Sequence, residues 1–348
     1  MLVRRKRFAT RVLAGVAALA LSATVAVPGA RAAQPGNPMA GGPWYVDSQT
    51  AAAQAAQADE QAGETASASL LARIAQTPQS KWFIAADAAG NPYVTNFFAR
   101  ARAAVAQDPA TITVITLHGL PDQVCSGQNA PGAGSSQQYE NWINGYAQLI
   151  GSMRVDVFLE PDALAASSCL SPSLRAQRLE LMSYAARTLS ALGHTGVYED
   201  AGAGDWRPLK TMAALLKGAG VRYARGFSLN TTHYDWTGNE VLYGRRLSRL
   251  LGGKHFVVNT AFNGRGPQLD AHGGHLWCNP IGRSLGPLPT LRTPSPLVDA
   301  FFWLGNPGLS DGTCNGGPEV GLFWPKWALA LVRDTAGARD FPTYRGGL

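Results

Sequence analysis

Helical segments alternate with short apolar runs along residues 95–260, and few folds accommodate that order. The segments with helical character are Asn96–Gln107, Tyr139–Ser152, Leu174–Leu192, Leu209–Ala219 and Arg245–Leu251. The apolar runs between them are Ile112–Leu117, Val155–Leu159, Gly196–Asp200, Tyr223–Leu229 and His255–Thr260. Buried strands separated by helices are typical of parallel βα units. The pattern predicts an α/β fold, either a barrel or a large open sheet.

The segment ahead of this pattern is rich in Ala and Gln. Leu70, Leu71 and Ile74 lie at helical spacing within residues 49–76, which predicts one or two surface helices. The chain contains no internal repeat and no Ser/Thr/Pro-rich linker leading to a separate module. We therefore expect one folded domain over residues 33–348.

The first 32 residues have the composition of an export signal. A basic start, Arg4–Arg7, precedes an apolar run over Val12–Val27 and the motif Ala30-Arg31-Ala32. This order is typical of a cleaved signal peptide, and the apolar run is too short to favour a stable membrane span. We expect cleavage after Ala32 and a secreted, soluble product without a membrane partner; an uncleaved anchor is the alternative.

The net charge of +7 does not indicate a nucleic-acid partner. Six basic residues and no acidic residue lie within positions 1–32, so 24 of the 30 basic residues remain to face 23 acidic ones. The expected mature chain is nearly neutral and lacks the basic excess that phosphate backbones require. We therefore expect no nucleic-acid binding.

An even number of cysteines in an exported chain predicts disulfides. The four cysteines are Cys125, Cys169, Cys278 and Cys314, which allow three pairings that spacing does not distinguish. The sequence has no C-x-x-C motif and no HExxH motif, and the loop His272–His275 carries two histidines without other ligands. Walker and G-x-G-x-x-G motifs are also absent, so we expect no metal and no cofactor.

Three aspartates lie where catalytic carboxylates are expected. Asp162 and Asp200 follow apolar runs, and the carboxyl ends of barrel strands form the active face of such folds. Pro161 and apolar neighbours surround Asp162, a setting that raises a carboxyl pKa as a general acid needs. A helix N-cap is the alternative for Asp162. Asp311 precedes Gly312, and an ordinary turn is its alternative.

Tryptophans are numerous, with nine in the chain. Trp82, Trp206, Trp277 and Trp303 lie near expected strand ends or in loops. Aromatic rings stack on the apolar faces of sugars, whereas packing in the core is the alternative for each ring. The set, beside Asn and Asp residues, indicates a saccharide ligand.

Five motifs taken in order resemble glycoside hydrolase family 6, the secreted cellobiohydrolases and β-1,4-endoglucanases. They are Leu120-Pro121-Asp122 with Cys125, Leu159-Glu160-Pro161-Asp162, Asp200-Ala201-Gly202 with Trp206, Trp277-Cys278-Asn279, and Ser310-Asp311-Gly312. The resemblance extends over nearly the whole expected mature chain, from Asn37-Pro38 to about residue 330.

This resemblance implies a distorted barrel of about seven parallel strands and the disulfides Cys125–Cys169 and Cys278–Cys314. It implies glycoside hydrolysis with inversion, in which Asp162 protonates the leaving oxygen. Asp311 is then expected to help activate water, and Asp200 to hold the hydrogen-bond network. The residues expected to contact sugar are Trp82, Trp206, Asn230, Asn263, Trp277 and Asn279.

The chain also departs from the family pattern. Val124 stands where the family has a catalytic Asp, and His118 stands where it has a Tyr. The remaining departures remove polar groups and lie at Ala203, at Asn259 to Phe262, which read Asn-Thr-Ala-Phe in place of Asp-Thr-x-Arg, and at Gly305 and Leu309. A changed sugar specificity, with contacts from Asp122, Glu199, Asp205 or His233, is one reading.

The leading hypothesis is a monomeric, secreted, inverting hydrolase of β-1,4-glucan or a related polysaccharide. Short loops at Gly127–Ser136 and Gly264–Gly274 favour an open cleft and endo action. A catalytically impaired glycan-binding protein on the same scaffold is the first alternative. A structural envelope protein is the second, and dispersed aspartates would favour it.

Overall fold

A curled sheet of seven parallel strands forms the centre of the computed structural model, which describes residues 36–121 and 132–335. The spatial order of the strands is β1-β2-β3-β4-β5-β6-β9, and every neighbouring pair is parallel. Their bounds are β1 Lys81–Ile84, β2 Thr113–His118, β3 Val155–Leu159, β4 Thr195–Asp200, β5 Gly226–Leu229, β6 His255–Asn259 and β9 Val298–Phe302. A small hairpin, β7 Gln268–Leu269 and β8 His275–Leu276, lies outside the sheet.

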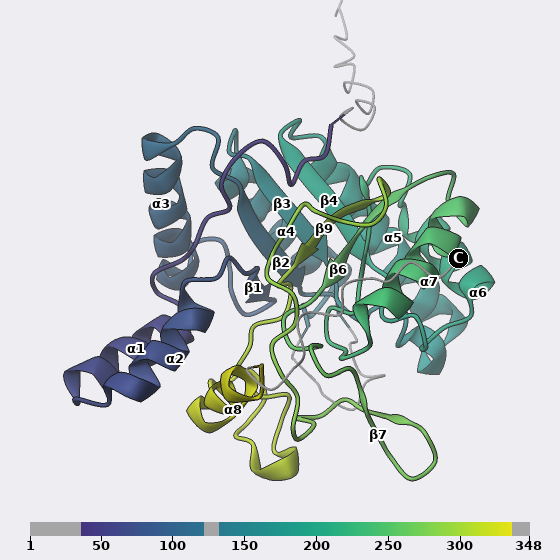
Figure 1. The fold of residues 1–348 in the computed structure, drawn as a ribbon. Coiled ribbons are helices and arrows are strands. Elements are labelled where there is room, and N and C mark those ends of the chain that lie inside the picture. The colour runs from purple at the N-terminus through teal and green to yellow at the C-terminus, as the bar shows by residue number, and fades with distance from the viewer. Residues whose placement is uncertain (1–35, 122–131, 336–348) are drawn as a thin grey trace, which may run out of the picture.

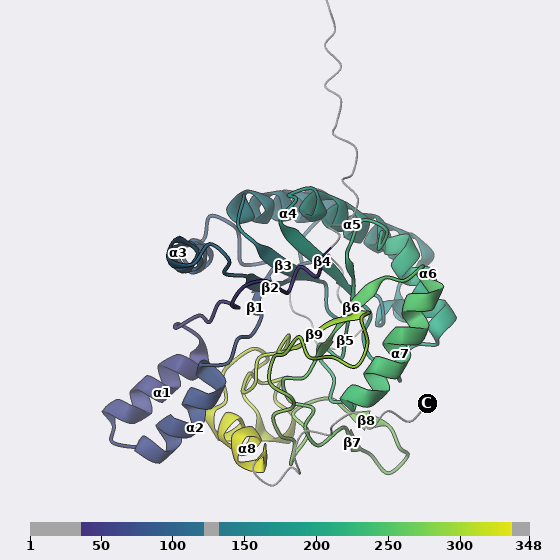
Figure 2. The same ribbon diagram turned by 45° about the horizontal axis from the view of Figure 1, so that its top comes forward.

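Helices cover the outer face of the curled sheet, as Figure 2 shows for α3 to α7. The helices are α1 Ala51–Gln61, α2 Thr65–Ala75, α3 Pro92–Gln107, α4 Ser136–Ile150, α5 Pro172–Ser190, α6 Leu209–Ala219, α7 Thr237–Leu250 and α8 Pro325–Thr335. Four of them begin at polar caps whose side chains accept a backbone N–H: Thr50 for α1, Asn91 for α3, Ser135 for α4 and Ser171 for α5. The helix α8 lies beside α2 (Figure 1).

The edge strands β1 and β9 close the barrel through a few contacts and not through a continuous ladder of strand hydrogen bonds. Gln79 forms an isolated parallel bridge with Trp303, and the Ser80 N–H donates to the Trp303 carbonyl at 2.9 Å. The indole N–H of Trp82 donates to the carbonyl of Leu304 at 2.6 Å. The first and last strands are thus joined at their edges without continuous pairing. The predicted distorted barrel of about seven strands is confirmed.

The strands alternate between two faces. On β3, Val155, Val157 and Leu159 belong to the large apolar layer beneath the helices, whereas Phe158 lies in the barrel interior. Its ring stacks on Tyr198 of β4, with centroids 5.0 Å apart. Both faces are buried, which explains why the strands appear in the sequence as continuous apolar runs.

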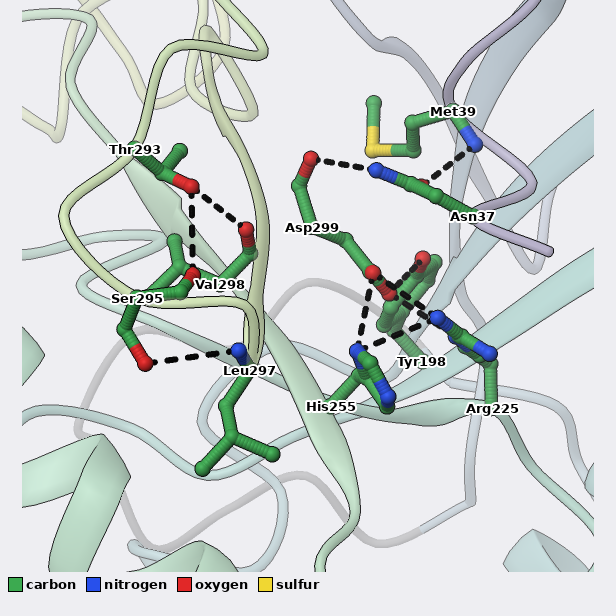
Figure 3. A network of polar contacts seen from close by, with 10 residues as sticks. All are labelled: Asn37, Met39, Tyr198, Arg225, His255, Thr293, Ser295, Leu297, Val298 and Asp299. Atoms are coloured by element: carbon green, nitrogen blue, oxygen red, sulfur yellow. Dashed lines mark hydrogen bonds and ion pairs between the residues drawn. The ribbon is translucent and has the colours of Figure 1, made fainter.

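A polar network ties the last strand into the barrel (Figure 3). The Asp299 carboxylate of β9 accepts two hydrogen bonds from Arg225, at 3.0 Å each, and lies 3.0 Å from His255 Nδ1. The hydroxyl of Tyr198 donates to the same carboxylate at 2.8 Å. The Asn37 side chain donates to the Asp299 carbonyl at 2.7 Å, which fixes the entering chain. These contacts come from four separate segments, so they stabilise the barrel.

The disulfide Cys278–Cys314 is present, with a Cα–Cα distance of 6.1 Å. Cys169 is also disulfide-bonded, but Cys125 and the predicted signal peptide lie outside the described residues. In the described ranges, no helix is long and apolar enough to cross a membrane.

Candidate active site

The loop after β3 and the carboxyl end of β4 bring two predicted aspartates into direct contact. Asp162 lies three residues beyond the last residue of β3, and Asp200 is the last residue of β4. The backbone N–H of Asp162 donates to Asp200 Oδ1 at 3.0 Å. Asp162 has a φ of 67°, so Pro161 is followed by a left-handed turn that a non-glycine residue seldom adopts. The carboxyl ends of adjacent strands thus build the floor of the site.

Asp200 is a buried organising group. Besides the Asp162 N–H, it accepts hydrogen bonds from the Gly202 N–H at 2.8 Å, Ser228 Oγ at 2.9 Å and Thr231 Oγ1 at 2.5 Å. Burial, and then the charge of Asp162, raise the pKa of Asp200 to about 6. Both oxygens are occupied by the protein itself. Asp200 therefore holds three loops in register.

Asp162 has the surroundings of a general acid. Thr232 Oγ1 donates to its Oδ1 at 2.6 Å, whereas Oδ2 has no hydrogen-bond partner in the described part of the chain. Burial raises the pKa of Asp162 to about 6. The helix N-cap alternative is wrong, because the carboxylate contacts Thr232 of another loop and the next short helix is preceded by Ala166.

Asp311 lies in the loop after β9, the last strand of the sheet, whereas Asp162 and Asp200 follow β3 and end β4. Tyr234 Oη donates to its Oδ2 at 3.0 Å, and the Asn279 N–H donates to the same atom at 2.9 Å. Its Oδ1 has no partner among the residues that the structure describes. Burial raises the pKa of Asp311 to about 6, and the charge of Asp162 adds to the increase. The two carboxyls therefore lie in one electrostatic environment.

Asn279 supports the Asp311 loop and does not face the solvent. It is 1% exposed, and its Nδ2 donates to the Gly312 carbonyl at 2.7 Å and to the Cys314 carbonyl at 3.1 Å. Its Oδ1 accepts the Asp311 N–H at 2.8 Å. The prediction that Asn279 contacts sugar is therefore wrong, because its amide is fully used in fixing the loop.

Asn230 and Asn263 are structural as well, so the prediction that they bind substrate is also wrong. Asn230 is fully buried and donates to the carbonyls of Asp235 and Asn259 at 3.1 and 3.2 Å. Asn263 is 2% exposed and donates to the Asp235 carbonyl at 2.8 Å and to Thr237 Oγ1 at 3.0 Å. Their amides replace missing backbone partners in loops below the site.

The four tryptophans divide by exposure. Trp277 is 43% exposed, and Trp82 and Trp206 are half-buried, so each has an accessible ring surface. The Trp206 ring lies 4.7 Å from that of His233, and the Trp82 ring lies 5.9 Å from that of His118. Trp303 is fully buried and donates to the Pro287 carbonyl, so it belongs to the core. Three rings remain as candidates for sugar stacking.

Several groups around the aspartates were not predicted. Thr231, Thr232 and Tyr234 supply hydroxyl donors to the three carboxylates. Glu160 is fully buried and accepts from the N–H groups of Gly119 and Leu120 at distances of 3.0 to 3.2 Å, which fixes the loop after β2. Burial raises its pKa to about 7. Proximity to Pro161-Asp162 is the only sequence signal for Glu160.

Other polar residues proposed for a rebuilt sugar site have different places. Glu199 is fully buried on the helix-facing side of β4, so it is not a sugar contact. Asp205 lies 2.6 Å from His275 of the β7–β8 hairpin. Oxygens of Asp205, Asp235 and Glu240 lie within 4.8 Å of one another. Glu240 accepts the Gly204 N–H at 2.9 Å, so internal partners explain this acidic cluster.

Comparison with known proteins identifies the family. The family model "Glycosyl hydrolases family 6" matches residues 39–335. This chain belongs to glycosyl hydrolase family 6. It is 37% identical over 293 residues to Endoglucanase A of Cellulomonas fimi, covering 84% of this chain and 61% of that protein. It is 33% identical to Endoglucanase 1 of Streptomyces halstedii, covering 92% of this chain and 97% of that protein.

Solved family 6 structures share the fold. The endoglucanase Cel6 of Mycobacterium tuberculosis, solved with a thio-linked methyl-cellobiosyl cellobioside, is 39% identical with a TM-score of 0.79. The match covers 86% of this chain and all of that chain. The cellobiohydrolase Cel6A of Chaetomium thermophilum is 24% identical with a TM-score of 0.73, covers 86% of this chain and 99% of that chain, and is similar in fold. The present chain spans less than two thirds of the length of two endoglucanase relatives. It covers 61% of the Cellulomonas fimi protein and 63% of Endoglucanase A of Thermobispora bispora.

Proposed function

We propose that this family 6 protein hydrolyses β-1,4-glucan with inversion at the anomeric carbon. The observation that carries the proposal is the pair Asp162 and Asp311, each with one carboxyl oxygen satisfied by the protein and the other without a partner among the described residues. Inverting glycosidases use two such carboxyls, about 6.5–9.5 Å apart. The endoglucanase relatives at 33–37% identity support glucan as the substrate class.

In the proposed reaction, each carboxyl takes part in one proton transfer. Asp162 Oδ2 gives its proton to the glycosidic oxygen while the bond from that oxygen to the anomeric carbon breaks. Water attacks the same carbon from the opposite face, and Asp311 Oδ1 accepts the water proton. Asp200 holds the Asp162 backbone throughout, at 3.0 Å. The sugar gains one hydroxyl from water with inverted configuration, and the leaving chain gains the proton.

Endo action is part of the proposal. The β7–β8 hairpin extends outward from the barrel (Figure 1), and Leu269 on it is 53% exposed. We infer that a hairpin in this position leaves the proposed substrate-binding site open to solvent. A long chain is then expected to bind at internal positions.

The test measures released reducing ends from soluble cellulose derivatives, mixed-linkage glucan, xylan and mannan, together with the viscosity of each solution. The proposal predicts glucan hydrolysis in which viscosity falls well before reducing ends accumulate. Saturable glucan binding without any release would support the glycan-binding alternative. A slow fall in viscosity relative to reducing ends would contradict endo action alone.

The proposal extends to location and assembly. We propose export after removal of residues 1–32, supported by the composition of that segment. We also propose a monomeric mature protein. Mass spectrometry of protein from the culture medium tests the cleavage directly. The expected N-terminal residue is Ala33.

The pH dependence of hydrolysis is expected to be bell-shaped and centred near pH 6. Asp162 must carry a proton and Asp311 must be ionised, and burial raises the pKa of both to about 6. Activity falls above this pH as Asp162 loses its proton, and below it as Asp311 gains one. A profile of kcat/KM measures both limbs. Constant activity through pH 6 would contradict the assignment.

Replacing Trp277 by Ala is expected to weaken binding of cello-oligosaccharides about 2- to 10-fold, since one ring stack contributes about 0.5–1.5 kcal/mol. The ring is 43% exposed, so its removal leaves little cavity. Trp236→Ala is the matched control, because that ring is 41% exposed at the start of α7. Calorimetric titration measures both variants. An equal loss in both would exclude a specific stack on Trp277.

A further inference from the structure

An aromatic pair lies directly behind Asp311. Phe262 and Tyr234 have ring centroids 4.7 Å apart at an angle of 40°. Phe262 is 7% exposed and Tyr234 is 2% exposed, and both belong to the apolar cluster that includes Leu331 of α8. The polar end of this pair is the Tyr234 hydroxyl, which donates to Asp311 Oδ2 at 3.0 Å.

The far side of the Phe262 ring is closed by Gly305. A Cβ atom at Gly305 would lie 2.4 Å from Phe262 Cε1 and 2.6 Å from Cζ, which real side chains do not tolerate. The absent side chain therefore provides the space that the ring occupies. The two departures from the family motifs at residues 262 and 305 are thus sterically linked, because the Phe262 ring fits only where residue 305 has no side chain.

The backbone on both sides of the Phe262 ring is fixed by hydrogen bonds. Asn259 is fully buried, and its Oδ1 accepts the N–H groups of Gly305 at 3.1 Å and of Ala261 at 3.1 Å. One amide oxygen thus fixes the backbone of Gly305 and the backbone next to Phe262. The ring is held between this clamp and Tyr234, so its position determines that of the Tyr234 ring.

We propose that Phe262 is a positioning residue for Asp311, acting through Tyr234, and that Gly305 is the second half of the same device. This inference rests on the proposed role of Asp311 as the group that activates water. Holding Oδ2 on the Tyr234 hydroxyl orients the carboxylate so that Oδ1 remains directed to the attacking water of the proposed reaction. Phe262 itself touches neither substrate nor reacting atoms in this scheme.

Charged groups act on both Asp311 and Tyr234. Asp162 raises the pKa of Asp311, and the Tyr234 hydrogen bond lowers it. Arg283 acts on Tyr234 from a facing loop, while burial and Asp311 raise the Tyr234 pKa well above its usual value. The hydroxyl therefore stays protonated as a donor. Losing its alignment is expected to raise the pKa of Asp311, which shifts the acidic limb of the activity profile to higher pH.

The experiment compares Phe262→Ala, Tyr234→Phe and the double variant, with carbon-13 NMR titration of the Asp311 carboxyl and kcat and KM across pH. We expect Phe262→Ala to lower kcat by up to about 10²-fold with little change in KM, as misplacement of a reacting group does. Both single variants should raise the Asp311 pKa. The double variant should be no worse than Tyr234→Phe, because the effect of Phe262 passes through that hydroxyl.

Controls separate positioning from folding. Leu331→Ala removes a buried side chain from the same cluster and should leave the Asp311 pKa at its wild-type value. Phe262→Leu keeps most of the apolar volume if the alanine variant does not fold, and should show a smaller shift in the same direction. Gly305→Ala pushes the ring from the other side and should reproduce the shift.

An unchanged Asp311 pKa in a folded Phe262 variant, or multiplicative effects in the double variant, would overturn the inference. Failure of the proposed function has a different signature. Asp311→Asn would then keep wild-type kcat, while the titration of Asp311 in the Phe262 variants still reports whether the ring positions it.

Discussion

Replacement of Asp162 by Asn is expected to lower the rate of glucan hydrolysis by about 10²–10⁴-fold while saccharide affinity stays close to that of wild type. Asparagine has the size of aspartate, and its Oδ1 can still accept the Thr232 hydroxyl, which lies 2.6 Å from Asp162 Oδ1. The amide cannot supply the acidic proton. Reducing-end release and calorimetric binding, measured on the same preparation, separate the two effects.

The matched control is Asp156→Asn, the same substitution on the same strand–loop segment but in the barrel interior. Asp156 lies on β3, pairs in register with Val114 and Gly196, and is 1% exposed. It should retain wild-type kcat. Hydrolysis at the wild-type rate by Asp162→Asn would remove the acid assignment, whereas equal losses in both variants would indicate a general effect of the substitution on the barrel.

Asp156→Asn is expected to stabilise the protein, and the gain should grow with pH. The Asp156 Oδ2 atom is buried and has no hydrogen-bond partner. The Oδ1 atom fits because residue 196 is glycine: a Cβ atom at Gly196 would lie only 2.1 Å from it. Burial, and then the charge of Asp299, raise the pKa of Asp156 to about 8, against an ordinary value of 3.8. The folded state therefore favours the neutral acid.

The sign of this dependence follows from proton binding. The folded state binds the proton more tightly than the unfolded chain, so the contribution of Asp156 to stability is full below pH 3.8 and is lost as pH rises through about 8. Asparagine has no such loss. At pH 7 the difference in the free energy of unfolding is at most about 4 kcal/mol in favour of the variant.

Chemical denaturation at several pH values between 4 and 8 measures this difference, within the window set by the two pKa values. Asp47→Asn is the contrasting control. The Asp47 carboxylate is paired with Arg100 at 2.9 and 3.0 Å, so removing its charge should destabilise the fold. A stability difference for Asp156→Asn that stays constant with pH would show that the carboxyl is ionised in the folded barrel.

The fold was predictable from the sequence where the apolar residues of a segment follow one clear pattern, either a continuous run or a helical repeat. Val155–Leu159 and Leu209–Ala219 are found with the bounds expected from the sequence. β1 was missed because it has four residues, only one of them buried. β9 was missed because Asp299 interrupts its apolar run, and the residues that satisfy this carboxylate, Arg225, His255 and Tyr198, are distant in sequence.

The helix bounds show a similar limit. α7 begins at Thr237 and not near Arg245, because its first turns pack polar residues such as Glu240, which the apolar pattern does not register. α8 was not predicted, although its buried side chains, Trp327 and Leu331 among them, pack against α2. Burial of these side chains depends on α1 and α2, which are distant in sequence.

The aspartates of the candidate site were identifiable because a carboxylate directly after an apolar run is uncommon. The groups that orient them were not. Thr232 and Tyr234 are ordinary loop residues in the sequence, and only the curl of the sheet brings them to Asp162 and Asp311. Asn230 was misassigned for the converse reason, since a buried amide that satisfies loop backbone looks like a polar binding residue until its burial is known.

The disulfide Cys278–Cys314 fixes one side of the candidate site. It covalently links the segment of Trp277 to the segment of Asp311, and Asn279 adds hydrogen bonds across the same junction. Asp162 belongs instead to the β3–β4 side, held through Asp200. A shift of this linked segment would carry the proposed sugar-stacking indole of Trp277 and the proposed water-activating carboxyl of Asp311 together. Their connection to Asp162 runs instead through one loop, whose Thr232 and Tyr234 hydroxyls bond the two aspartates.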